Sequence, residues 1–388
     1  MSESMPNPAR SASLWLSMFS LMVSSNMTTP IVGIYATLRL NADPVTVGAI
    51  YGAQTITAFL FRLPAVWLSS KIGLANMMLA GLIAVSIGGI IYTVASSPFQ
   101  LIVGGLVRGL GSGAYHPAVL SYVYSEAGEN GRRSGHLGYM LSAPPLGMIL
   151  GPAIGAAVFT LAGYTASFIS AAAIPLAASG VLYLYGPAND DVKPTFSLKD
   201  MAQRRFAALL MSRLIVNYVA GTISAFLPLL VHTYMGLSEQ AVFLLFSLAA
   251  AFNLMARFMS GPISAWIGED WMLTSGSLLV AISALFMVWA MGAMVWVGMA
   301  VYGVGIGYFV ISSVALVGQM LQPAARPLGF AFMTSMIDLG NGLGNLVSGL
   351  LLDRYGFTAV FATAALIGVL GTLLDMANRI GRRQFSMP

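Results

Sequence analysis

The stretch GMILGPAIGA, residues 147–156, holds three glycines and a proline in a strongly apolar part of the chain. Gly147, Gly151 and Gly155 are spaced by four residues, so they share one face of a helix. Because lipid tails are as apolar as leucine side chains, membrane helices associate by close packing at small residues. The spacing therefore predicts a membrane helix that lies close to a neighbouring helix. Pro152 removes one backbone hydrogen bond within it and permits a bend.

The composition of the whole chain indicates a membrane protein. Of its 388 residues, 57% are hydrophobic and 8% are charged, whereas a soluble domain carries about 25% charged residues. Apolar runs of about 20 residues recur along the sequence, and each can cross a hydrocarbon core of about 30 Å as a helix. Twelve runs, called spans one to twelve, are predicted at residues 13–38, 45–69, 73–95, 97–124, 133–161, 164–186, 205–234, 240–266, 271–292, 294–321, 327–352 and 356–378.

Lysine and arginine lie mostly on one side of the predicted membrane. That side holds both termini and the connections after the even-numbered spans, with Arg10, Lys71, Arg132, Arg133, Lys193, Lys199, Arg204, Arg205, Arg326, Arg379, Arg382 and Arg383. The other side holds Arg39 and Arg354. Since cytoplasmic loops are rich in basic residues, we expect both termini in the cytoplasm and the chain in the inner or plasma membrane. The net charge of +5 suits an anionic lipid surface, and no nucleic acid is expected as a partner.

A long polar connection, GPANDDVKPTFSLKDMAQRR at residues 186–205, divides the chain into halves with six spans each. We predict an N-terminal bundle at residues 1–186, a cytoplasmic linker at 187–204 and a C-terminal bundle at 205–388. The halves repeat. The matching positions are Gly109, Gly111 and Gly113 with Gly303, Gly305 and Gly307; Arg62 and Gly73 with Arg257 and Gly268; Gly147 and Gly151 with Gly340 and Gly344; and Pro30 with Pro228. The predicted fold class is an all-α membrane protein of two pseudo-symmetric six-helix bundles.

Duplicated bundles favour a secondary transporter, in which the bundles rock about a site near the bilayer midplane and expose it alternately. The sequence has no GxxxxGK[ST] phosphate loop, no cluster of metal ligands, no Ser/His/Asp grouping at helical spacing and no cysteine. We therefore expect neither an enzyme nor a cofactor or metal site. A receptor or scaffold is the weaker alternative, because the sequence shows no additional soluble domain.

These motifs resemble those of the major facilitator superfamily. Gly147, Gly151, Pro152 and Gly155 fit the GxxxGPxxG motif that its drug/proton antiporters carry in span five. The stretch RGLGSGAYHP is similar to the family's RxxxGxG motif, although its Arg108 stands about one helical turn nearer the glycines. The resemblance implies a monomeric antiporter of twelve spans, with span five packed against span eight of the other half. It also implies that spans one, four, seven and ten line the transport cavity.

Asp338 is the strongest candidate for proton coupling. It lies near the middle of span eleven, whereas Asp375 lies close to the cytoplasmic end of span twelve. A carboxylate inside the membrane can bind and release a proton as water reaches it from either side. The alternative is a structural aspartate held by hydroxyls and an arginine of another helix. Polar residues predicted on the same face are Thr334, Ser335, Asn341, Asn345 and Ser348.

Arg108 is the leading candidate for substrate binding. It shares a face of span four with Ser112, Tyr115 and His116, and the resemblance turns this face toward the cavity. Arg108 would bind an anionic group, pair with Asp338 in one state, or hold backbone carbonyls near the glycines. His116 is a candidate proton relay or, alternatively, a hydrogen-bonded packing residue. Further candidates for the substrate site are Tyr115, Asn26, Asn217, Tyr302 and Asn341.

Three more arginines are predicted to act in gating or packing. Arg62 and Arg257 occupy equivalent positions of the repeat near cytoplasmic helix ends, where long side chains reach the membrane surface. Arg213 in span seven is predicted to lie at the cytoplasmic mouth. Together with the small residues of the span-five motif, these arginines form the predicted gating and packing set.

We hypothesise proton-coupled efflux of small organic or drug-like molecules by alternating access. The alternative is uptake or exchange of a small organic anion bound by Arg108, because arginines outnumber acids inside the spans. The expected partners are the small-molecule substrate, protons or Na⁺, and the lipid bilayer. The sequence leaves the substrate, the direction of transport and the coupling ion open.

Overall fold

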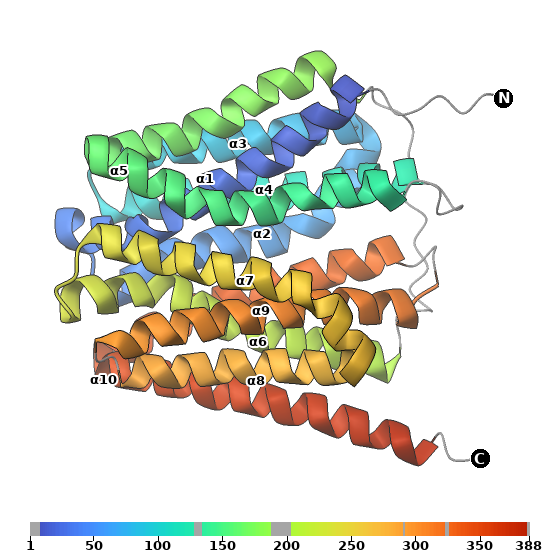
Figure 1. The fold of residues 1–388 in the computed structure, drawn as a ribbon. Helices are drawn as coiled ribbons and strands as arrows, with labels where there is room; N and C mark the ends of the chain where they lie inside the picture. The colour runs from blue at the N-terminus through green and yellow to red at the C-terminus, as the bar shows by residue number, and fades with distance from the viewer. Residues whose placement is uncertain (1–7, 128–133, 188–202, 290–291, 323–325, 386–388) are drawn as a thin grey trace. The chain divides into compact units, whose positions relative to one another are not determined.

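The computed structural model describes residues 8–127, 134–187, 203–289, 292–322 and 326–385, so most of the predicted linker at 187–204 lies outside the described residues. Within these ranges the chain is helical and contains no strand (Figure 1). The helices are α1 (Pro8–Leu40), α2 (Pro44–Ile72), α3 (Leu74–Val94), α4 (Pro98–Ala127), α5 (Ser134–Tyr185), α6 (Arg204–Leu229), the π-helical turn η2 (Leu230–Tyr234), α7 (Glu239–Ile267), α8 (Glu269–Val288), α9 (Ala293–Met320) and α10 (Arg326–Phe385). The prediction of an all-α protein is confirmed.

Two of these helices reverse direction at a glycine. α5 holds 52 residues and α10 holds 60, and a straight helix of 52 residues would be about 78 Å long, more than twice the hydrocarbon core. α5 is broken at Gly163 (φ 73°) and α10 at Gly356 (φ 78°), and each runs back after the break (Figure 1). Glycine adopts a positive φ without steric strain. Each of these helices is therefore two segments, divided close to the predicted boundaries of spans five and six and of spans eleven and twelve.

The turns before α3 and α8 have the same backbone geometry. Gly73 precedes α3 with φ 89°, and Gly268 precedes α8 with φ 85°. The N–H of Gly73 donates to the carbonyl of Ser69 at 2.9 Å, and that of Gly268 donates to the carbonyl of Ser264 at 2.8 Å. Both pairs match at an offset of 195 residues. The predicted correspondence of spans two and eight is thus confirmed in the backbone.

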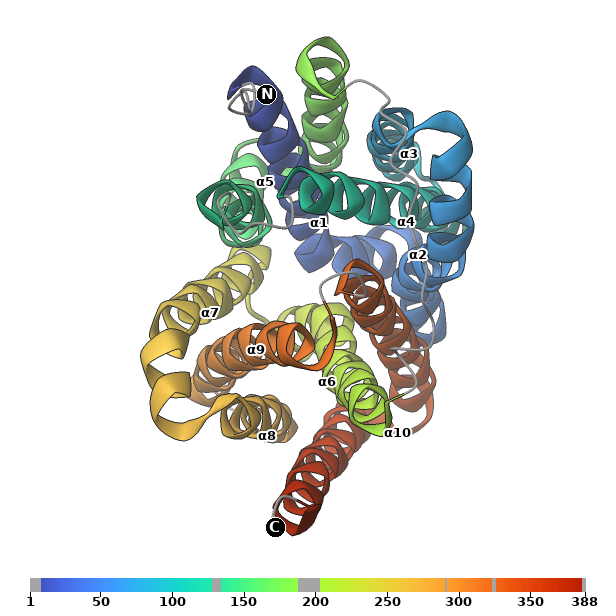
Figure 2. The same cartoon turned by 90° about the vertical axis from the view of Figure 1, so that its right-hand side faces the viewer.

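The contacts divide the chain into two units. Unit 1 holds residues 1–29 and 56–194, and unit 2 holds residues 30–55 and 195–388. In unit 2, α6 lies between α9 and α10 (Figure 2). The division differs from the predicted bundles at residues 30–55, which pack on α10 within unit 2. Glycines let the start of α2 approach α10 closely. A Cβ on Gly48 of α2 would lie 2.6 Å from Asn345 O of α10, and one on Gly349 of α10 would lie 3.3 Å from the Cα of Gly48.

Each unit contains the same glycine crossing. In unit 1, α3 meets α4 where a Cβ on Gly81 would lie 2.7 Å from Gly111 O. In unit 2, α8 meets α9 where a Cβ on Gly276 would lie 2.8 Å from Gly305 O. Distances this short leave no room for a side chain. The glycine repeat of spans four and ten therefore reflects one packing arrangement that is used twice.

The glycines of span five pack on α1. A Cβ on Gly147 would lie 2.6 Å from Met22 Cβ, and the equivalent Cβ on Gly340 in α10 would lie 2.9 Å from Asn217 Cβ in α6. Gly151 lies one turn further along the contact with α1. Within unit 1, the close approach that these two glycines permit is therefore to α1. The predicted packing of span five against span eight, which is α7 of unit 2, stays a prediction.

Two predictions about proline have different outcomes. α5 continues as a helix through Pro152, and both Pro152 and Gly155 are buried. Pro30 and Pro228 are 198 residues apart, whereas α1 and α6 match at 195. The pairing of Pro30 with Pro228 is therefore wrong by about one helical turn, because the two prolines occupy different positions of the repeat.

The outer surface suits lipid. Within the described ranges, eight helices, with α5 and α10 each counted once, are long and apolar enough to cross a membrane. Large apolar side chains such as Leu161, Phe258 and Trp266 are between 76% and 88% exposed. Exposed apolar surface on this scale is unfavourable in water and expected in a bilayer.

Replacing Gly344 with alanine should push α6 and α10 apart, because the new Cβ would overlap the carbonyl oxygen of Tyr218. We expect the free energy of unfolding to fall by about 1–3 kcal/mol, as in other overpacked cores. The control is Gly261→Ala in α7, where nothing lies within 4 Å of the added Cβ. Thermal unfolding in detergent measures both variants, and equal melting temperatures would contradict the crossing.

Candidate functional site

Asp338 lies in the first segment of α10 and is partly exposed. Asn345 is seven residues further along, on the same face of the helix. The carbonyl of Asn345 is the atom that meets Gly48 of α2, whereas Gly340 lies on the far side of α10 against α6. Asp338 therefore belongs to the side of α10 that packs, two turns later, on the start of α2.

The polar residues predicted around Asp338 have several different partners. Thr334 and Ser335 each donate to the carbonyl of Ala331 in their own helix at 2.9 Å. The hydroxyl oxygen of Ser348 lies 2.9 Å from that of Thr222 in α6. The hydroxyls of Thr334 and Ser335 are thus satisfied within their own helix, and only that of Ser348 bonds to a neighbouring helix.

Arg108 lies inside unit 1, between α1 and α3, and is 1% exposed. Its Nη2 donates to Ser24 Oγ of α1 at 3.3 Å, and its guanidinium carbon lies 5.6 Å from the ring centre of Tyr92 in α3. Gly88 of α3 leaves the space that the aliphatic part of Arg108 fills. Nε and Nη1 have no hydrogen-bond partner among the described residues. The predicted cavity-facing arginine is thus a buried cation with unused donors in this structure.

The surroundings of Arg108 supply no counter-charge from its own unit. The predicted spans in unit 1 contain neither Asp nor Glu. An unpaired cation inside a membrane protein costs several kcal/mol, and such residues are usually retained for a functional reason. The two unused nitrogens could therefore bind an anion.

Tyr115 is fully buried in unit 1, and its hydroxyl is hydrogen-bonded to Ser17 of α1. It does not line a cavity in this structure, because Gly81 lets α3 close over it. His116 is partly exposed, with its ring centre 5.9 Å from that of Tyr115, and it lies within electrostatic range of Arg62. His116 is in unit 1 and Asp338 is in unit 2, so a relay between them stays a prediction.

Unit 2 also holds two arginines close to each other. Arg213 of α6 is buried; it donates through Nη1 to Ser313 of α9, and its guanidinium carbon lies 5.8 Å from the ring centre of Phe309. Arg257 of α7 donates through Nε to Asn253 Oδ1 at 2.7 Å and lies within electrostatic range of Arg213. The structure therefore anchors Arg213 in the interior of unit 2, where it contacts α9.

Apart from the buried Tyr115, the predicted amide and phenol candidates Asn26, Asn217, Asn341 and Tyr302 are partly exposed. Asn26 donates to the carbonyl of Met22 at 2.8 Å, and Asn217 donates to the carbonyl of Arg213 at 2.7 Å, so both amides bond to their own helices. Asn341 contributes backbone atoms to the contact of α10 with α6. Tyr302 occupies in α9 the repeat position that Arg108 occupies in α4.

The sequence analysis missed one candidate, Asp375 in the second segment of α10. Asp375 is 6% exposed, and its Oδ2 lies 2.8 Å from Ser277 Oγ of α8. It was set aside because it stands near a helix end in the sequence. The signal that could have found it is the polar spacing of Asp270, Thr274 and Ser277 on one face of the otherwise apolar α8.

A surface hollow in unit 2 contains no charged side chain. It lies at the turn after η2 and the start of α9 and is lined by Tyr234, Met235, Leu237, Gly292, Ala293 and Trp296. None of the ionisable candidates lines it, so we do not assign it a role in transport.

The comparisons with known proteins agree with this fold. The model of the Major Facilitator Superfamily matches residues 14–313 and 209–379. An uncharacterized MFS-type transporter of Methanocaldococcus jannaschii is 20% identical over 373 residues, which cover 92% of this chain and 94% of that protein. A POT family transporter in complex with a thioalcohol-conjugated peptide has a TM-score of 0.79 at 14% identity, with 97% of this chain and 96% of that chain covered. The nucleoside transporter NupG has a TM-score of 0.74 at 14% identity, with 97% and 99% covered.

Arg108→Met should leave the free energy of unfolding unchanged or raise it, by up to about 4 kcal/mol, because it removes a buried charge that lacks a counter-ion. Ser24→Ala should lower it by about 1–3 kcal/mol, because the guanidinium then loses the one acceptor described for it. Thermal unfolding in detergent distinguishes the two variants. A strongly destabilised Arg108→Met protein would show that the arginine is structural.

Proposed function

Because the chain belongs to the major facilitator superfamily and is a membrane transporter, not an enzyme, we propose that it exports small organic or drug-like molecules in exchange for protons. The observation that carries this proposal is Asp338, a carboxylate within a membrane helix and partly exposed. The complete span-five motif, with Gly147, Gly151 and Pro152, supports antiport through its resemblance to the drug/proton type.

The packing within each unit supports alternating access. Within each unit, backbones touch at glycines in the same register, and contacts of this kind hold helices together without long side chains that would need to repack. Each unit can then move largely as one body, as transporters with internal repeats do. We place both termini in the cytoplasm and expect a monomer.

Asp338 would couple the two fluxes by competition. A proton that enters from outside neutralises the carboxylate and favours the return of the empty site across the membrane. Because proton and substrate compete for the site, the substrate is released as the proton binds. A single titrating carboxylate suits a proton better than Na⁺, which requires several oxygen ligands around it.

Asp338→Asn should abolish transport driven by a pH gradient, because an amide cannot exchange a proton, and should leave substrate counterflow at equal pH intact. Both are measured with purified protein in proteoliposomes and a panel of solutes. Asp353→Asn makes the same chemical change at an exposed position of the same helix and serves as the control. Proton-driven transport that survives in Asp338→Asn would refute the assignment.

A second candidate function is uptake or exchange of a small organic anion. It is favoured by Arg108, whose Nε and Nη1 are buried without a hydrogen-bond partner among the described residues. A carboxylate or phosphate could accept from both nitrogens in the paired geometry that guanidinium provides. Binding there requires α3 or α4 to move, because Arg108 is enclosed in this structure.

Arg108→Lys tests this second function. Lysine keeps the charge but loses the paired donors, so anion uptake should fall sharply while transport of neutral solutes does not change. The measurement is uptake of anionic and neutral solutes under pH gradients of either sign. Anion uptake accelerated by inward protons would favour this function over efflux, and equal anion uptake by Arg108→Lys would exclude paired recognition.

A further inference from the structure

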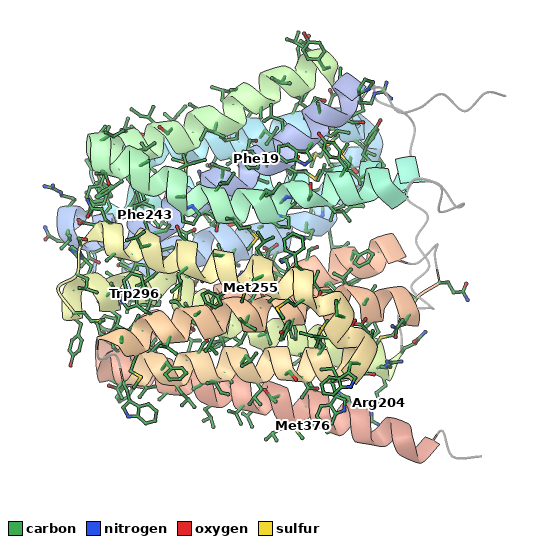
Figure 3. All side chains as sticks on the ribbon, in the orientation of Figure 1. Phe19, Arg204, Phe243, Met255, Trp296 and Met376 are labelled. Atoms are coloured by element: carbon green, nitrogen blue, oxygen red, sulfur yellow. The ribbon has the colours of Figure 1, made fainter. Side chains whose placement is uncertain are left out.

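Two arginines of unit 2 stand at similar depths in their helices. Arg213 comes nine residues after Arg204, where α6 begins. Arg257 comes ten residues before Ile267, where α7 ends. Each therefore lies about 15 Å along its helix from that end, and both ends are predicted on the cytoplasmic side. Figure 3 shows Arg204 at one end of unit 2 and Met255, two residues before Arg257, farther from that end.

α9 meets both arginine-bearing positions within two helical turns. A Cβ on Gly307 of α9 would lie 2.7 Å from the Cβ of Ala256, the residue before Arg257. Six residues after Gly307, Ser313 accepts a hydrogen bond from Nη1 of Arg213, and six residues rise about 9 Å along a helix. The two arginines lie within electrostatic range of each other beside this stretch of α9.

The described hydrogen bonds of both guanidiniums go to neutral side chains. Arg213 donates to Ser313 and is 5% exposed, and its Nε is buried without a hydrogen-bond partner among the described residues. Arg257 is partly exposed and donates through Nε to Asn253 Oδ1 at 2.7 Å. Two like charges inside a membrane protein repel more strongly than in water, because their surroundings are less polar. An anion between them would relieve this repulsion and accept from the unused nitrogen of Arg213.

Most acidic residues in the described part of unit 2 lie near helix ends or bond to other side chains. They are Glu239, Glu269, Asp270, Asp353 and Asp375. Asp338 stands at a depth similar to that of Arg213, because Gly340, two residues later in α10, contacts Asn217 of α6. Asp338 is therefore the acid of this unit to be distinguished from an added anion.

We propose that Arg213 and Arg257 form an anion-binding site inside unit 2, which takes a carboxylate or phosphate group, free or as part of a larger organic molecule. Guanidinium groups donate to such oxygens in a fixed, paired geometry. Arg257 is partly exposed and would meet the anion first, and Arg213 would bind it from the interior. For its role in transport the inference rests on the second candidate function, whereas binding can be observed without transport.

Inorganic phosphate and benzoate, each added at constant ionic strength to the purified protein in detergent, test the site. We expect a saturable rise in the melting temperature of the wild type that is lost in Arg213→Gln and in Arg257→Gln. Arg205→Gln makes the same change near the start of α6, where Arg205 pairs with Asp270, and should keep the rise. A wild type that shows no rise with either anion, or a rise that persists in Arg213→Gln or Arg257→Gln, would overturn the proposal.

Arg257→Glu covers the case in which the glutamine variants do not fold. It places a carboxylate near Arg213, where the anion would bind, so it should melt at a higher temperature than Arg257→Gln and show no further rise with phosphate. A variant that is less stable than Arg257→Gln, or that still responds to phosphate, would contradict an anion held between the two arginines.

Two further variants separate this site from other charged groups. If Asp338 already neutralises the arginines, the wild type will show no rise with phosphate and Asp338→Asn will gain one, which would overturn the site in the native protein. If Arg108 of unit 1 binds the anion instead, the rise will be lost in Arg108→Gln and kept in Arg213→Gln, which would also overturn it.

Uptake into proteoliposomes then tests the role of the site in transport. Arg257→Gln should reduce the uptake of anionic solutes severalfold and leave the uptake of neutral solutes unchanged. Full anion uptake by this variant would overturn the transport role. If the wild type takes up no anion, the second candidate function fails, and the melting curves still decide whether Arg213 and Arg257 bind one.

Discussion

The structure depends on backbone contact between helices at glycine. In a bilayer, apolar side chains gain little by meeting each other, since lipid is equally apolar, and helices are held by the closeness of their packing. Carbonyl oxygens lie where a Cβ would otherwise be at four glycines: Gly81 and Gly111 in unit 1, and Gly276 and Gly305 in unit 2. The same register appears in both units because the sequence is duplicated.

This packing also determines how buried charge is accommodated. Three of the buried ionisable groups, Arg108, Arg213 and Asp375, each have a serine as a described hydrogen-bond partner, namely Ser24, Ser313 and Ser277. A hydroxyl can donate or accept, so it serves a cation and a carboxyl equally well. A serine hydroxyl also allows the buried group that it bonds to gain or lose its charge, whereas an ion pair would oppose that change. Hydroxyl partners therefore suit a protein whose buried groups gain or lose protons or anions.

The positions of the helices and the repeat could be predicted from local features of the sequence. Long apolar runs require helices in a bilayer, and Gly163 and Gly356 mark the reversals, because a positive φ there needs a residue without a side chain. The partners of those helices could not be predicted in the same way. Gly147 indicated that some helix comes close, but its spacing did not say that this helix within unit 1 is α1.

The sequence by itself determined that this protein is all-helical, lies in a membrane, repeats internally and places a few ionisable residues inside its spans. These properties follow from residue type and spacing along one helix. Only the tertiary structure decided that Tyr115 and Arg108 are enclosed, that residues 30–55 group with the C-terminal half, and that Asp375 is buried between serines. Burial and hydrogen bonding depend on which residues of other helices, distant in the sequence, come to lie beside a side chain, and helical periodicity says only which way that side chain points.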